Sequence, residues 1–115
     1  MAAVAAKGRT VFRNAAAEPH VQDLARFLVA MGASIEGIGS NMYVVEGGRP
    51  LQGARHTIGP DHIEIGSFIG LAAVTNSALT IDGVRGDDLR GTLLGFERLG
   101  IRPRLDGTKL IVDAH

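Results

Sequence analysis

The stretch from Asn14 to Ala33 reads NAAAEPHVQDLARFLVAMGA and carries the clearest structural signal in the chain. Pro19 suits the first turn of a helix, because its fixed φ matches the helix and its missing N–H would have no partner there. Apolar residues then recur at spacings of three and four, which is typical of a helix with one buried side. These residues are Val21, Leu24, Phe27, Leu28 and Met31. The stretch therefore predicts a helix that begins at Pro19 and ends before Gly32.

The same hydrophobic pattern returns 68 positions later without a gap. Val11–Ala15 falls on Leu79–Gly83, and Met42–Val45 falls on Leu110–Asp113. Identical residues are few, so chance similarity between two αβ units is the alternative. Because the register has no gap over the whole span, we favour an internal repeat.

The second copy, residues 54–115, predicts a complete β-α-β-α-β-β unit. Its first helix is apolar nearly all round, which indicates a buried helix. Gly100 is placed to end the second helix in the left-handed conformation, and Asp106-Gly107 is a strong hairpin signal. We expect strands at Ala54–Ile58, Ala78–Asp82, Ile101–Leu105 and Lys109–Asp113, a helix starting at Pro60, and a helix with Asp87 and Asp88 in its first turn.

The first copy, residues 1–47, has the same order of elements but is truncated at its N-terminus. Its long helix is followed by a strand pair at Ala33–Gly37 and Met42–Glu46. Its opening strand and most of its first helix would precede Met1. Residues 48–53, which contain glycine and proline, are the expected linker between the units. We predict an α+β fold, and a chain that is one segment of a longer protein.

The composition excludes several classes of protein. The 12 lysines and arginines balance the 12 aspartates and glutamates, so the basic footprint of a nucleic-acid binder is missing. The chain has no cysteine, which removes disulfides, thiolate metal sites and a cysteine nucleophile. The longest strongly apolar stretch, Phe68–Val74, is too short to cross a bilayer. We expect a cytoplasmic protein with neither nucleic-acid nor membrane partners.

Two motifs resemble one enzyme family. Residues 14–33 are similar to the NAAxEPxVxDLxxFLxxMGA stretch of UDP-N-acetylglucosamine 1-carboxyvinyltransferases, and Gly59–Phe68, GPDHIEIGSF, looks like their PDRIExGTF motif. The motifs stand in the order and at the spacing that the family shows. The resemblance implies a fold of two lobes, each built from three β-α-β-α-β-β units, with the substrates bound between the lobes. On that map the chain is one unit and most of another, and the remaining units of the enzyme are its partners.

The resemblance also implies a reaction. The enolpyruvyl group of phosphoenolpyruvate moves to the 3-hydroxyl of UDP-N-acetylglucosamine, in peptidoglycan precursor synthesis, through a tetrahedral intermediate. Such chemistry needs an acid, a base, and cations for the phosphate and the carboxylate. None of the family motifs that supply these groups matches a stretch of this chain. We therefore predict no catalytic residue here, and no turnover by the isolated chain.

Four side chains in the two motifs are candidates for the substrate cleft: Glu18, Asp61, His62 and Glu64. By resemblance, Glu18 and Asp61 would orient catalytic lysine or arginine groups from elsewhere in the enzyme. The structural alternative, which we favour, is that each carboxylate caps the start of a helix. Glu64 either shares acid–base work with Asp61 or completes a capping box, and the capping box is simpler. His62 stands where the family usually has arginine, so this position lacks the permanently charged, bidentate group of that residue.

Two further patterns are weaker. His56, His62 and Glu64 could form a metal set, but histidine in or beside a strand is far more often a surface residue, and we predict no metal site. Gly37-Ile38-Gly39 and Gly47-Gly48 complete neither a dinucleotide fingerprint nor a P-loop. Such glycines are typical of turns, so we predict no cofactor.

Two other functions stay open. One is a non-catalytic binding or structural module that has the same fold. The other is a segment of a shikimate-type enolpyruvyl transferase, an enzyme built from the same repeated unit.

Overall fold

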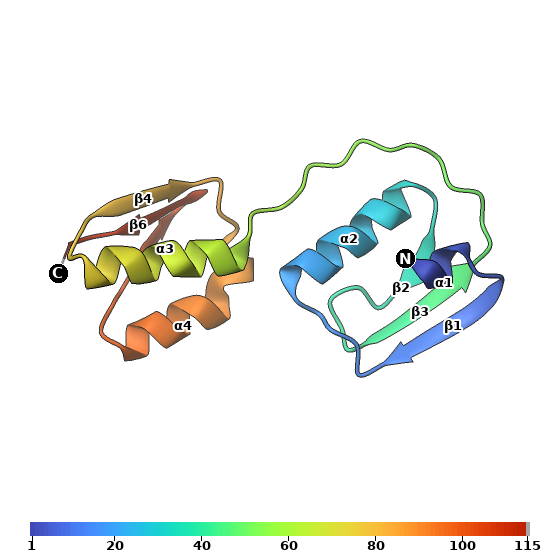
Figure 1. Cartoon of the computed structure of the whole chain (residues 1–115), viewed down its shortest axis with the longest axis horizontal. Coiled ribbons are helices and arrows are strands. Elements are labelled where there is room, and N and C mark those ends of the chain that lie inside the picture. Colours follow the sequence, from blue (N-terminus) through green and yellow to red (C-terminus); the bar gives the residue numbers. More distant parts are fainter. Residues whose placement is uncertain (115) are drawn as a thin grey trace. The chain divides into compact units, whose positions relative to one another are not determined.

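The computed structural model describes residues 1–114, and its helices and strands form two separate units (Figure 1). The first comprises Met1–Gly59 and the second Pro60–His115. Each combines helices with one antiparallel three-stranded sheet, which confirms the predicted α+β class. None of the helices within residues 1–114 has the length and apolar character that crossing a membrane requires.

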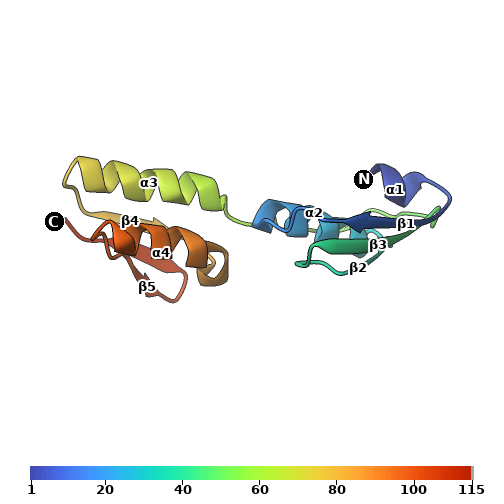
Figure 2. The same cartoon turned by 90° about the horizontal axis from the view of Figure 1, so that it is seen from below.

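The first unit has its elements in the order α-β-α-β-β. They are α1 (Ala2–Ala5), β1 (Gly8–Arg13), α2 (Pro19–Ala30), β2 (Ser34–Glu36) and β3 (Met42–Gly47). The last strand, β3, lies in the centre and pairs with both β1 and β2. Val4 on α1 forms a small core with Ala33 and with Val45 on β3, so the short helix α1 covers one end of the sheet (Figure 2).

Helix α2 confirms the prediction made from Pro19 and Gly32. Pro19 is its first residue. At the other end, Gly32 has φ of 109°, a left-handed conformation that glycine adopts without the steric cost of a Cβ atom. The N–H of Ala33 donates to the carbonyl of Leu28 at 3.0 Å, which satisfies one of the last carbonyls of the helix.

The second unit repeats this order. It contains α3 (His62–Val74), β4 (Leu79–Asp82), the 3₁₀ turn η1 (Gly86–Leu89), α4 (Arg90–Arg98), β5 (Arg104–Asp106) and β6 (Lys109–Val112). Its last strand, β6, is again central. The core gathers around the fully buried Ile69, Leu89 and Leu110. The prediction that the first helix is buried on nearly every side is wrong for this unit, because α3 leaves Phe68 and Leu71 exposed (43% and 53%).

The identical strand orders, β1-β3-β2 and β4-β6-β5, confirm the internal repeat. The hydrophobic pattern predicts a constant offset of 68 residues between the two copies. In the strands this offset is wrong by one residue. Tyr43 is buried on β3 and pairs with Phe12, whereas Leu110 is buried on β6 and pairs with Ile81. The central strands are thus related by 67 residues and the first strands by 69, because the connections differ in length between the two units.

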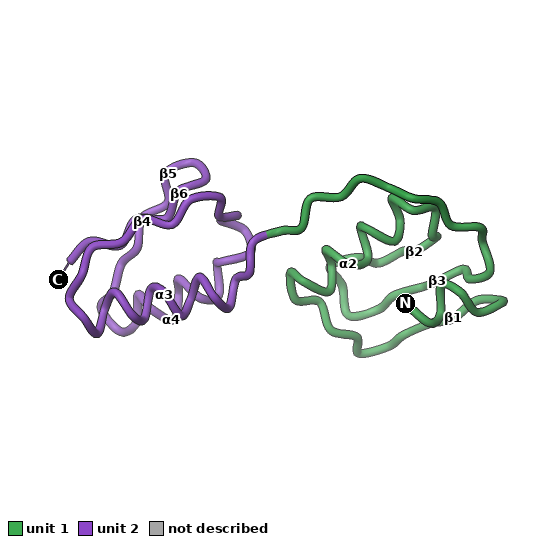
Figure 3. Tube along the Cα trace, turned by 45° about the horizontal axis from the view of Figure 1, so that its top comes forward, with its two compact units in different colours: residues 1–59 green, residues 60–115 purple. Residues whose placement is uncertain are grey.

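The strand predicted at Ala54–Ile58 is not formed. Residues 48–59 contain neither helix nor strand, and they run along the first unit (Figure 3). The N–H of Gln52 donates to the carbonyl of Met31 at 2.8 Å, and His56 is bound by a side chain of α2. The segment is therefore held by contacts with α2 instead of by a neighbouring strand.

Candidate functional site

The start of α2 leaves the carboxylate of Glu18 exposed. Glu18 is the residue before the helix, and its side chain makes no capping hydrogen bond. Its backbone carbonyl accepts from the N–H groups of Val21 (2.9 Å) and Gln22 (3.1 Å). The expected capping role of this carboxylate is therefore wrong, and the side chain is available to a partner group.

The start of α3 is capped by Asp61. Its Oδ1 accepts from the N–H of Ile63 at 2.9 Å and from the N–H of Glu64 at 3.2 Å, which confirms the capping prediction for this residue. Glu64 lies in the first turn and is exposed. Within residues 1–114 its carboxylate accepts no hydrogen bond from the backbone of Asp61, so the reciprocal half of a capping box is not formed.

The four candidate side chains fall in different units. Asp61, half-buried His62 and Glu64 come together in the first turn of α3, whereas Glu18 belongs to the first unit. Chemically, the carboxylates of Glu18 and Glu64 can each accept hydrogen bonds or pair with a cation. The Asp61 carboxylate is already engaged by backbone N–H groups.

A contact that sequence reasoning missed joins Asp23 on α2 to His56. Oδ1 of Asp23 lies 3.1 Å from Nε2 of His56, and Oδ2 accepts from the N–H of Gly59 at 3.1 Å. The imidazole also stacks on Phe27, with ring centroids 5.0 Å apart and planes inclined by 23°. Both polar side chains are about five-sixths buried. The sequence offers one signal for this contact. Asp23 and Phe27 are four residues apart, so both lie on the same face of α2.

His56 was considered above as part of a metal set. It belongs to the first unit and binds Asp23, whereas His62 and Glu64 belong to the second unit. Across residues 1–114, no group of three or more histidine, cysteine, aspartate or glutamate side chains is arranged to hold a metal ion.

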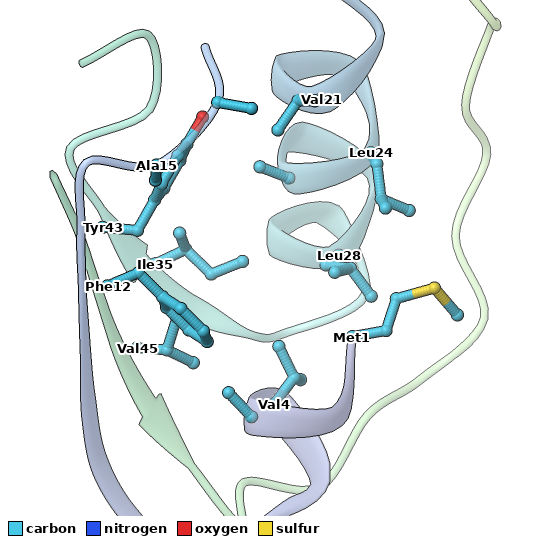
Figure 4. Close-up of a pocket in the computed structure, with 13 residues that line it drawn as sticks. Met1, Val4, Phe12, Ala15, Val21, Leu24, Leu28, Ile35, Tyr43 and Val45 are labelled. Carbon is cyan, nitrogen blue, oxygen red and sulfur yellow. The ribbon is translucent and has the colours of Figure 1, made fainter. Parts of the chain in front are cut away.

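The first unit also contains an apolar pocket of about 220 Å³. It lies between α1, α2 and the sheet (Figure 4). Its walls include Val4, Phe12, Leu24, Leu28, Tyr43 and Val45. The hydroxyl of Tyr43 is buried there and makes no hydrogen bond within residues 1–114. An unpaired buried hydroxyl carries a desolvation cost, and the sequence pattern did not indicate it.

Comparison with known proteins shows that the chain is similar to one group of enzymes. A family model described as EPSP synthase (3-phosphoshikimate 1-carboxyvinyltransferase) matches residues 1–102. Proteins named UDP-N-acetylglucosamine 1-carboxyvinyltransferase are 57% identical over 115 residues in Bradyrhizobium diazoefficiens, 53% over 112 residues in Treponema denticola and 49% over 114 residues in Bacteroides thetaiotaomicron. These matches cover 97–100% of the chain, which spans only 26–27% of the relatives' length.

A solved structure has the same fold. The crystal structure of the enolpyruvyl transferase NikO from Streptomyces tendae matches with a TM-score of 0.74 and 24% identity, over 96% of this chain and 27% of that one. The resemblance predicted from the two sequence motifs is confirmed by the names of the relatives.

Proposed function

We propose that the chain, which belongs to the EPSP synthase family, is part of an enzyme with a nucleotide-sugar acceptor. That enzyme transfers the enolpyruvyl group of phosphoenolpyruvate to the 3-hydroxyl of UDP-N-acetylglucosamine and releases phosphate. The observation that carries this assignment is identity of 49–57% with the three relatives of that name, over nearly the whole chain. The reaction belongs to peptidoglycan precursor synthesis, in the cytoplasm.

The proposed contribution of this chain is to line and orient the substrate cleft. Glu18 supports this role because its exposed carboxylate caps no helix and can bind a cationic side chain of the enzyme. The first turn of α3 adds His62 and Glu64, on a helix start that Asp61 fixes through two hydrogen bonds. The acid, the base and the phosphate-binding cations come from the remaining three-quarters of the enzyme.

A second acceptor is favoured by one observation. The family model is described by its 3-phosphoshikimate enzyme, which uses a different hydroxyl acceptor. The relatives support the sugar nucleotide more strongly, because the three compared above, at 49–57% identity, are named for it.

The test is a grafted enzyme. The matching quarter of the Bradyrhizobium diazoefficiens relative is replaced by residues 1–115, and phosphate release from phosphoenolpyruvate is measured with UDP-N-acetylglucosamine or with 3-phosphoshikimate. We expect turnover of the same order as the intact relative with the sugar nucleotide only. The relative with that quarter deleted is the negative control.

Two outcomes would contradict the proposal. Turnover with 3-phosphoshikimate alone would assign the chain to the other acceptor. A grafted enzyme that melts cooperatively, like the intact relative, but is inactive with both acceptors would favour the non-catalytic module.

A further inference from the structure

The segment of residues 48–59 is attached at two points along α2. Just after the helix, the carbonyl of Met31 accepts from the N–H of Gln52 at 2.8 Å. In the second turn, Asp23 binds His56. Met31 and Asp23 are eight positions apart, which is a rise of about 12 Å along a helix. The chain from Gln52 to His56 spans about 14 Å at most, so it has little slack between the two attachments.

The attachment at Asp23 holds the segment by two hydrogen bonds. Nε2 of His56 lies 3.1 Å from one carboxylate oxygen, and the N–H of Gly59 donates to the other at 3.1 Å. The side chains of Asp23 and His56 are only 15% and 17% exposed. Apolar side chains could hold the segment as firmly, because taking polar groups out of water is costly. The hydrogen bonds add a direction that an apolar contact lacks, so the carboxylate fixes one backbone N–H in place.

The chain between this attachment and α3 is short and stiff. Only Pro60 and Asp61 separate Gly59 from His62, the first residue of the helix. The ring of Pro60 fixes its own φ and restricts the backbone of the residue before it. The side chain of Asp61 is bonded to the helix start that it caps. Few bonds are therefore left to rotate between the N–H that Asp23 holds and the first turn of α3.

We propose that Asp23 is a positioning residue for the enolpyruvyl transfer. Its carboxylate acts through His56 and Gly59 to fix the point from which the chain enters α3, and so the place at which His62 and Glu64 meet the substrates. A displacement of about 1 Å at a reacting group can cost about a hundredfold in rate. This role rests on the proposed function, because it requires that the first turn of α3 lines the substrate cleft.

The kinetics of the grafted enzyme test this role. Asp23→Ala removes both hydrogen bonds, and we expect kcat/KM for UDP-N-acetylglucosamine to fall at least about tenfold. Asp23→Asn retains one acceptor oxygen, so its kcat/KM should fall less. His56→Phe keeps a ring that can stack on Phe27 but loses the bond to Asp23, and its kcat/KM should also fall.

A matched control separates positioning from stability. Val45 is buried and packs with Val4 and Ala33, so Val45→Ala leaves a cavity and should lower the melting temperature at least as far as Asp23→Ala does. We expect Val45→Ala to leave kcat/KM unchanged at a temperature at which every variant is folded. Equal losses of kcat/KM in the two variants, or full activity of Asp23→Ala, would overturn the positioning role.

Amide relaxation of the 115-residue chain, without substrate, separates this inference from the proposed function. Asp23→Ala should lower the ¹⁵N order parameters of the Gly59 and Asp61 amides and leave that of Ser67, within α3, unchanged. Unaltered order at Gly59 and Asp61 would overturn the inference even where the graft is active. A graft with the native sequence that is inactive with both acceptors would instead overturn the proposed function, and the role of Asp23 with it.

Discussion

The carboxylate of Asp23 lies 3.1 Å from Nε2 of His56, across 33 positions of sequence. The same carboxylate accepts from the N–H of Gly59 through its other oxygen. One side chain of α2 thereby holds two points of a segment that has no secondary structure of its own. Such contacts should supply most of the free energy that orders residues 48–59, because the segment has no ladder of strand hydrogen bonds.

Replacing Asp23 with asparagine should loosen this segment. The amide keeps one acceptor oxygen but loses the charge and the second acceptor, so we expect a loss of about 1–2 kcal/mol in the unfolding free energy of the first unit. Hydrogen exchange at the Gly59 amide should rise about tenfold. Glu36→Gln, at an exposed carboxylate of the same unit, should stay within about 0.5 kcal/mol. Unchanged exchange at Gly59 would contradict the contact.

Alanine substitutions at Asp61 and at Glu18, the residues that precede α3 and α2, should have different effects on the unfolding free energy. Asp61→Ala removes an acceptor of two backbone N–H groups and should lower the unfolding free energy of the second unit by about 1 kcal/mol. Glu18→Ala removes a side chain that caps nothing and should change the first unit by less than about 0.5 kcal/mol. Urea unfolding measures both, and Asp61→Ser should recover most of the loss. Equal losses at the two positions would show that Glu18 is also a cap.

Gly47 should not tolerate a side chain. A Cβ atom there would collide with the carbonyl oxygens of Ala3 and Ala6, since α1 passes directly over the end of β3. Gly47→Ala should therefore displace α1 and cost about 1–3 kcal/mol, measured by thermal unfolding. Gly53→Ala is the matched control, because a Cβ at that position meets nothing within 4 Å. A Gly47→Ala chain as stable as Gly53→Ala would contradict the close approach of α1.

The grafted enzyme tests the role proposed for Glu18. Glu18→Gln keeps the shape of the side chain but removes its charge, so a cationic partner in the cleft would lose its orientation. We expect kcat/KM to fall about tenfold to a hundredfold while the melting temperature stays unchanged. Glu36→Gln in the same graft should leave both quantities unchanged. If Glu18→Gln retained full activity, the residue would have no part in the cleft.

Local signals in the sequence predicted much of the fold. Pro19 and Gly32 predict the two ends of α2 closely, because proline and glycine act through their own backbone geometry. The Asp106-Gly107 turn joins β5 and β6 for the same reason. Asp61 is a cap, as a carboxylate before a helix predicts.

The missed features depend on contacts between distant residues. The strand expected at Ala54–Ile58 has suitable residues, but His56 binds Asp23 and stacks on Phe27 instead. The pocket and the unpaired hydroxyl of Tyr43 depend on how α1, α2 and the sheet pack together, which hydrophobic spacing alone does not reveal. Glu18 and Asp61 resemble each other in sequence context, yet only Asp61 turns its carboxylate to the helix.

The central strand of each sheet is the last to leave the ribosome. β1 and β2 do not pair with each other, and both depend on β3, so neither has its backbone partner until Met42–Gly47 has been synthesised. Until then the nascent chain exposes unpaired strand edges, which invite wrong pairings. In the second sheet, β4 and β5 likewise have no backbone partner until Lys109–Val112 has been synthesised. Each sheet is thus completed at its final strand, and the first sheet can form while the second unit is still being made.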